Sequence, residues 1–143
     1  MSKGNTFEND LMKLIFQATA IANLADNAAT SPLTNLYISL HTADPGEAGD
    51  QTTNEATYTG YARVAVARTS GGWTVTDNAA ENAAAVNFAQ CTAGSNTITH
   101  FAVGTLASGA GKILYSGALS ASLAVSAGIT PSFAAGALDI SED

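Results

Sequence analysis

Residues whose side chains could support catalysis or metal binding cluster at the end of one alternating segment. The segment 36–50, "LYISLHTADPGEAGD", alternates apolar and polar residues up to His41 and then carries Asp44, Glu47 and Asp50. Imidazole and carboxylate groups serve as general acids and bases and as metal ligands. The first question is therefore whether this segment forms an active site or a strand that ends in a polar loop.

No complete motif accompanies these residues. A catalytic zinc site needs about three protein ligands, but the only histidines are His41 and His100, and neither H-E-x-x-H nor C-x-x-C occurs. The acids of the loop, Glu55 included, could offer oxygen ligands to Ca²⁺, yet the EF-hand pattern is missing. The chain also lacks the G-x-S-x-G elbow, and "SGAGKI" at 108–113 departs from a phosphate loop. We therefore predict no enzyme, no metal and no cofactor.

The acidic segment has a simpler interpretation as a turn that opens a long loop. In Asp44-Pro45-Gly46 the proline sets φ, the glycine supplies a positive φ, and the aspartate bonds the turn backbone. Irregular segments as long as 43–60 are usually either functional or mobile. We predict that this loop is a contact surface, with interface residues Asp44, Glu47, Asp50, Tyr58 and Arg63.

The elements around this loop follow from hydrophobic periodicity. Residues 5–25 form an amphipathic pattern with period 3.6, and its apolar stripe includes Phe7, Leu11, Leu14 and Ile15. The predicted helix could pack on the protein's own sheet or dock into a neighbouring subunit. We include these four residues in the candidate interface.

From residue 35 onward the pattern changes to short β-like runs. Turn residues punctuate them, which is typical of an antiparallel sandwich or barrel and not of a parallel α/β fold. We predict one domain, 1–143, in which an N-terminal helix precedes a jelly-roll-like antiparallel β-sandwich of about eight or nine short strands over 35–141. The predicted strands cover residues 36–41, 61–68, 73–76, 84–89, 97–103, 112–118, 122–126, 129–134 and 137–141.

Composition restricts the possible partners. Only 12% of the 143 residues are charged, and 12 acids against 5 bases give a net charge of −7. An acidic surface does not attract nucleic acid or anionic lipid, and no apolar run approaches the ~20 residues that span a bilayer. Because few charges remain to solvate a lone monomer, we expect protein partners and a homo-oligomer. The single cysteine, Cys91, excludes an internal disulfide.

The order of several segments resembles a known family. "LYISLHTADPG" is followed by "YARVAVAR", "GGWTV", "AAAVNF", "THFAVGT" and "LYSGALSASLAVSAGITPSFAAGALDI". This order is similar to that of small virion proteins of tailed bacteriophages and prophages, often labelled phage tail fibre proteins. The resemblance implies a non-enzymatic virion protein assembled in the host bacterial cytoplasm, whose partners are the major capsid protein or tail proteins.

Three hypotheses follow for the function. The first is an oligomeric decoration or cement protein on the capsid surface, because a compact chain without repeats or heptads offers no shaft. The second is a structural or adaptor protein of the tail or its fibres. The third is a module that binds glycans on the host surface.

Overall fold

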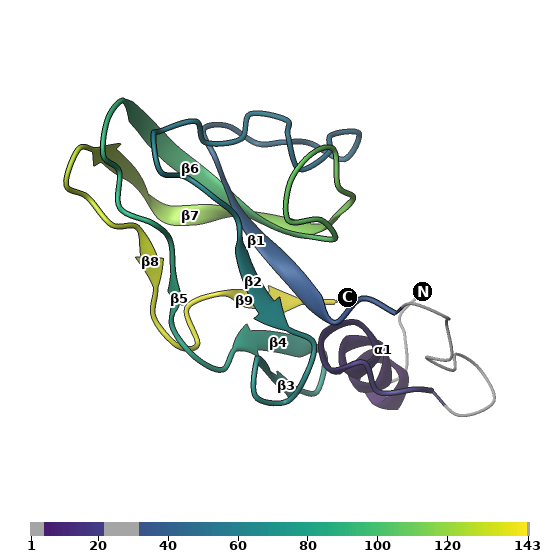
Figure 1. The fold of residues 1–143 in the computed structure, drawn as a ribbon. Helices are drawn as coiled ribbons and strands as arrows, with labels where there is room; N and C mark the ends of the chain where they lie inside the picture. Colours follow the sequence, from purple (N-terminus) through teal and green to yellow (C-terminus); the bar gives the residue numbers. More distant parts are fainter. Residues whose placement is uncertain (1–4, 22–31, 143) are drawn as a thin grey trace. The chain divides into compact units, whose positions relative to one another are not determined.

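The protein is described by a computed structural model that covers residues 5–21 and 32–142. Its described residues form one helix and nine strands, which are labelled in Figure 1. The chain divides into two compact units, one comprising Met1–Asn35, Val66–Val86 and Phe133–Asp143 and the other Leu36–Ala65 and Asn87–Ser132. The elements are α1 (Asn5–Gln17), β1 (Asn35–His41), β2 (Val64–Ala67), β3 (Trp73–Thr76), β4 (Ala79–Asn82), β5 (Val86–Asn87), β6 (Ser95–Gly104), β7 (Ile113–Ser126), β8 (Ser132–Phe133) and β9 (Asp139–Ser141).

The first unit packs α1 on a small antiparallel sheet. Strands β3, β4 and β9 form this sheet in that order, and α1 contacts β3 and β4. The ring of Phe16 meets Trp73 edge to face, with centroids 4.5 Å apart. Burial of these apolar side chains forms the core of the unit, which comprises Met12, Phe16, Val66, Trp73, Ala80, Val86, Leu138 and Ile140.

The helix is shorter than the predicted 5–25. It ends at Gln17, because Ala18 adopts a left-handed φ of 53° and Thr19 N then donates to Lys13 O. The guanidinium of Arg68 closes this end, donating to the carbonyls of Leu14 (2.6 Å) and Ile15 (2.7 Å). A cation at the C-terminus of a helix also interacts favourably with the negative end of the helix dipole. The predicted continuation over 22–25 lies outside the described residues.

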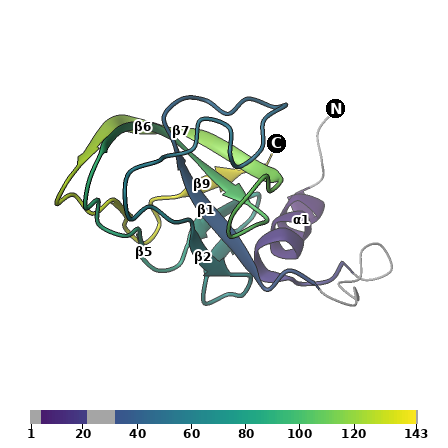
Figure 2. The same cartoon turned by 45° about the horizontal axis from the view of Figure 1, so that its top comes forward.

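The second unit is built on a longer antiparallel sheet. The sheet has the order β2-β1-β6-β7, and β6 and β7 run side by side in Figures 1 and 2. In the β1–β6 pair Ile38 lies opposite Val103, and His41 lies opposite His100. The apolar side chains buried in this unit are Leu36, Ile38, Leu40, Ala56, Tyr58, Phe88, Cys91, Ile98, Ala102, Val103 and Val125.

Strand β7 joins two of the predicted strands into one. Its pairing with β6 shifts between Ile98↔Leu123 and His100↔Ala118. Four residues of β7, 119–122, therefore face Thr99 alone, and a bulge of this kind bends a strand without ending it. The predicted break between 112–118 and 122–126 coincides with this bulge.

The predicted fold class is confirmed: the protein is mainly β, with antiparallel sheets and one N-terminal helix. Strand β4 (Ala79–Asn82) was not predicted, and β2, β5 and β8 are shorter than their predicted runs. The single domain and the jelly-roll connection stay predictions.

Candidate interaction surface

The loop 43–60 is fixed to the sheet through His41. The alternation of the strand places His41 on the face opposite Leu36, Ile38 and Leu40, yet His41 is fully buried, because the loop covers that face. His41 Nδ1 lies 2.8 Å from the carbonyl of Thr53, and Nε2 lies 2.9 Å from Ser39 Oγ. Burial lowers the pKa of His41, although the bond to Thr53 and the nearby Glu55 partly oppose the shift.

The contact between Ser39 and His41 is not a catalytic pair that a substrate could reach. A serine beside a histidine is the usual arrangement of a nucleophile and its base. Here both residues are fully buried, and the second imidazole nitrogen meets a backbone carbonyl instead of a carboxylate. The pair therefore positions the loop on strand β1.

Arg63 and Glu55 form the second anchor of the loop. Arg63 Nε and Nη2 reach the two carboxylate oxygens of Glu55 at 2.6 and 2.8 Å. The remaining guanidinium donors bond the carbonyls of Leu106 (3.0 Å) and Gly109 (2.8 Å), and Tyr61 Oη donates to Glu55 (2.9 Å). The bond to Glu55 raises the pKa of Arg63, so this cation is permanent and joins the loop to the turn after β6.

Gln51 completes this connection, although no sequence motif pointed to its role. The Gln51 side chain is fully buried, and its Oε1 accepts a hydrogen bond from Leu106 N (2.9 Å). The backbone N–H of Gln51 donates to the Gly111 carbonyl. The side chain fills the space that a Cβ would need at Gly104 or Gly111, so both glycines are required by close approach. A polar residue in a loop gives no pattern from which such burial could be predicted.

The tip of the loop has the predicted turn. Asp44 Oδ1 accepts from Gly46 N (2.8 Å), and Gly46 has a φ of 70°. Asp50 is used in the same way, since its Oδ1 accepts from both the backbone and the hydroxyl of Thr52, which lowers the Asp50 pKa. These bonds agree with our interpretation of the segment as a turn.

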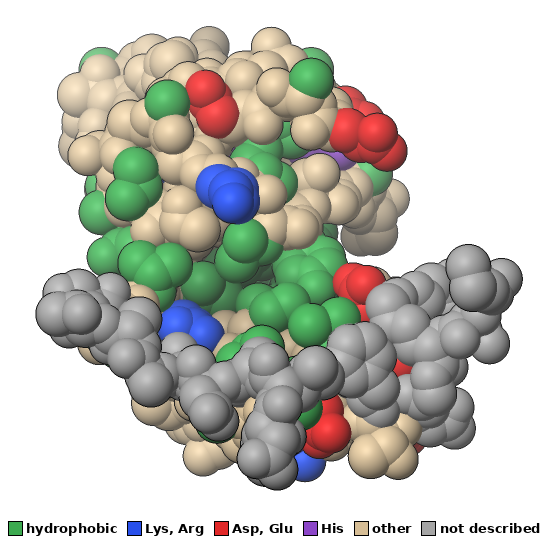
Figure 3. All heavy atoms as spheres, turned by 90° about the vertical axis from the view of Figure 1, so that its right-hand side faces the viewer, with side chains coloured by type: hydrophobic (Ala, Val, Ile, Leu, Met, Phe, Trp, Pro, Cys, Tyr) green, Lys and Arg blue, Asp and Glu red, His purple; other side chains and the backbone are tan. Residues whose placement is uncertain are grey.

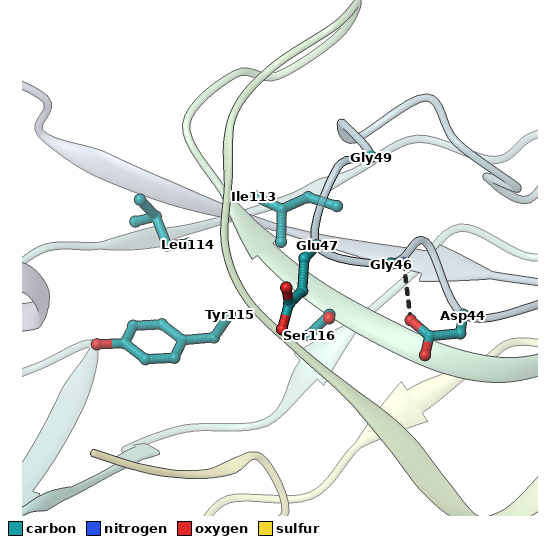
Figure 4. Close-up of a pocket in the computed structure, with 8 residues that line it drawn as sticks. All are labelled: Asp44, Gly46, Glu47, Gly49, Ile113, Leu114, Tyr115 and Ser116. Atoms are coloured by element: carbon teal, nitrogen blue, oxygen red, sulfur yellow. Dashed lines mark hydrogen bonds between the residues drawn. The ribbon is translucent and has the colours of Figure 1, made fainter. Parts of the chain in front are cut away.

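Asp44 and Glu47 line a pocket of about 410 Å³ between the loop and the beginning of β7. Figure 4 shows the Glu47 side chain directed toward Ser116, whereas the Asp44 carboxylate is turned back to Gly46. Residues Ile113–Ser116 form the opposite wall. Both acids are exposed, and Figure 3 shows carboxylates at the surface among mostly uncharged side chains. The pocket offers anionic oxygens beside the hydroxyl groups of Tyr115 and Ser116 and therefore suits contact with a cationic group.

The other predicted interface residues lie outside this pocket. Tyr58 is buried and donates to the Ala89 carbonyl (3.1 Å), and Arg63 is buried in its ion pair. The helix residues Leu11, Leu14 and Ile15 are half-buried, because Met12 and Phe16 form the packed face instead. The side chain of Phe7 lies outside the described part of the structure.

Two other kinds of site can be assessed over residues 5–21 and 32–142. This part of the chain has no group of three or more His, Cys, Asp or Glu side chains arranged to hold a metal ion. It also has no helix with the length and hydrophobicity that crossing a membrane requires.

In the described structure, the polar residues that first suggested chemistry form turns, anchors and one acidic pocket on a β framework. The chain belongs to the family described as Podophage GP4 fiber I protein gp80, whose model matches residues 3–141. The resemblance to phage virion proteins is thereby confirmed. A comparison with curated proteins gives no match.

Proposed function

We propose that the protein is a non-enzymatic structural subunit associated with a podophage fibre, the second of our three hypotheses. The family match over residues 3–141 carries this proposal, because the family is described as a fibre protein. The same match supports a phage structural role without favouring capsid decoration, our first hypothesis. The buried polar anchors His41 and Arg63 would hold the loop 43–60 in place as a contact surface of such a subunit.

The acidic pocket is the proposed contact with another virion protein. Asp44 and Glu47 are exposed at the tip of a loop that His41 and Arg63 hold in place. A partner that offers a lysine or arginine side chain would match the charge of the pocket. The half-buried residues Leu11, Leu14 and Ile15 remain a second proposed contact on α1.

Location can be tested by immunogold labelling of purified virions in the electron microscope. Gold on the fibres or their attachment region would support the proposal. Gold distributed over the capsid shell would contradict the proposal and support the capsid decoration hypothesis. Antibody pre-absorbed with the purified protein provides the control for unspecific labelling.

The contact can be tested by charge reversal and incorporation into particles. We expect an Asp44→Lys, Glu47→Lys variant to be incorporated less than the wild type. A matched control is Glu81→Lys, Asp139→Lys, which reverses two exposed acids on the β3-β4-β9 sheet. Equal incorporation of both variants would show that the acidic pocket is not the contact.

A further inference from the structure

His41 joins the loop 43–60 to the sheet on one face of β1. Glu55 lies opposite His41 on one side, and His100 of β6 lies opposite it on the other. Residues directly opposite one another in antiparallel strands point to the same face, so a carboxylate and two imidazoles form a row. Over residues 5–21 and 32–142 no such group is arranged to hold a metal ion. The row can still respond to protons, and His41 is its fully buried member.

The hydrogen bonds of His41 suit a neutral ring. Nδ1 lies 2.8 Å from the carbonyl oxygen of Thr53, which can only accept, so Nδ1 carries the proton of the neutral imidazole. Nε2 then accepts from Ser39 Oγ at 2.9 Å. A second proton would have to bind at Nε2, where it meets a hydroxyl group and not a carboxylate. The contact therefore offers no counter-charge to an imidazolium at that nitrogen.

The charges that face His41 do not replace this missing counter-charge. Glu55 favours a proton on His41, whereas Arg63 and His100 oppose it. Both carboxylate oxygens of Glu55 are already bonded by Arg63, at 2.6 and 2.8 Å, and Tyr61 donates to the same carboxylate. Burial is the largest cause that acts on the ring, and it lowers the pKa of His41 while the loop is in place.

The loop segment 42–54 is held mainly by polar contacts. All of its residues belong to the described structure, and only Pro45 and Gln51 among them are buried. Segments with few buried apolar contacts open locally at a lower free-energy cost than the core of a protein. Opening of 42–54 can therefore expose His41 without unfolding of the sheet below it.

We propose that the segment 42–54 is a proton-sensitive cover, closed over neutral His41 near neutral pH and opened in acid. Once exposed, His41 takes up a proton at its ordinary pKa of 6.5. The closed form is therefore fully favoured above that pH and loses stability as the pH falls below it. Asp44 and Glu47 lie in the same segment, so opening would remove one wall of the acidic pocket. This last consequence, regulation of the contact by pH, rests on the proposed function, whereas the opening itself does not.

Amide hydrogen exchange of the purified chain measures the opening. The backbone N–H groups of Thr42 and Gln51 donate to carbonyls at 2.8 and 2.9 Å, and both bonds break when the segment opens. Their protection factors, corrected for the intrinsic pH dependence of exchange, should fall by up to about tenfold between pH 7.5 and 5.5. Both should also lie at least about tenfold below the protection factor of Cys91, a fully buried residue whose N–H is bonded outside the loop. Equal protection of the three amides would mean exchange through global unfolding and would overturn the proposal.

Two histidine variants identify the group that takes up the proton. In His41→Gln the side chain keeps a donor and an acceptor but does not titrate, so the protection factors of Thr42 and Gln51 should change less than about twofold over the same pH range. His100→Gln removes the other imidazole of the row and should retain the pH dependence. Persistence of the dependence in His41→Gln, or its loss in His100→Gln, would contradict the assignment to His41.

The wild type provides a further measurement that needs no variant. In an NMR titration the ring of His41 should have its midpoint below pH 6.5, because the closed loop opposes the proton. A midpoint at or above 6.5, or constant protection of Thr42 and Gln51, would overturn the proposal. If the exchange results hold but charge reversal of Asp44 and Glu47 leaves incorporation unchanged, the cover stands and only the proposed contact fails.

Discussion

Replacement of Arg63 by methionine should destabilise the protein more than any substitution of an exposed charge. The variant keeps the length and apolar stem of the side chain but removes four hydrogen bonds, two to Glu55 and one each to Leu106 and Gly109. The Arg63 side chain is 2% exposed and that of Glu55 17%. The pair is therefore largely screened from water.

The magnitude follows from this difference in exposure. Removal of one partner of a buried ion pair costs about 3–5 kcal/mol, because the other charge is left without compensation. Water can partly rehydrate Glu55, which keeps its bond from Tyr61, and Leu106 and Gly109 are exposed residues. We therefore expect a loss near the lower limit, about 3 kcal/mol of unfolding free energy.

Urea unfolding followed by far-UV circular dichroism measures this loss, provided that the slope of the transition is unchanged. Lys112→Met is the matched control, because Lys112 is an exposed base close to the same turn, and it should change stability by less than about 0.5 kcal/mol. A Glu55→Gln variant and the double variant complete a thermodynamic cycle. A loss below about 1 kcal/mol for Arg63→Met would place the pair among exposed ion pairs and refute the reasoning.

Three further predictions concern other parts of the structure. Burial lowers the pKa of His41 below its ordinary 6.5, so the unfolded state takes up a proton at a higher pH than the folded state. The free energy of unfolding should therefore fall below that pH by up to about 1.4 kcal/mol per pH unit. In urea unfolding, His41→Gln should reduce this pH dependence between pH 7.5 and 5.5. Gly49→Ala should cost about 1–3 kcal/mol in thermal unfolding, because the new Cβ meets a backbone carbonyl oxygen, whereas Gly71→Ala meets only an ordinary contact. Phe16→Ala should cost about 3–5 kcal/mol and change the fluorescence of Trp73; an unchanged emission spectrum would contradict the edge-to-face contact.

The strands with clear alternation could be predicted from the sequence. β1 and β3 lie close to their expected limits, because alternating β-branched, aromatic and apolar residues fit a pleated and partly buried surface. β4 was missed since "AAEN" has low β-propensity, and its pairing with β3 and β9 is a tertiary effect. The helix was predicted too long because the alanines after Gln17 continue the helical pattern, and alanine rarely adopts the positive φ seen at Ala18.

The candidate site was predictable only in part. The Asp44 turn follows from local chemistry, because its bonds connect neighbouring residues. The burial of His41 and Arg63 was not predictable, since it depends on the loop packing back over strand β1 and on carbonyls more than 40 residues away in sequence. A polar residue at the end of a strand has the same sequence signature whether a loop covers it or water does.

The use of the two arginines explains why the surface is so acidic. Arg63 is neutralised within the loop, and Arg68 closes the end of α1 through backbone carbonyls. Of the five bases, these two are thus engaged in folding, whereas Asp44, Glu47, Asp77, Glu81 and Asp139 are exposed acids of the described structure. Long-range repulsion between copies is the consequence, and it directs association toward regions without charge. Higher salt should weaken a contact between the acidic pocket and a basic partner, because screening weakens the attraction between opposite charges.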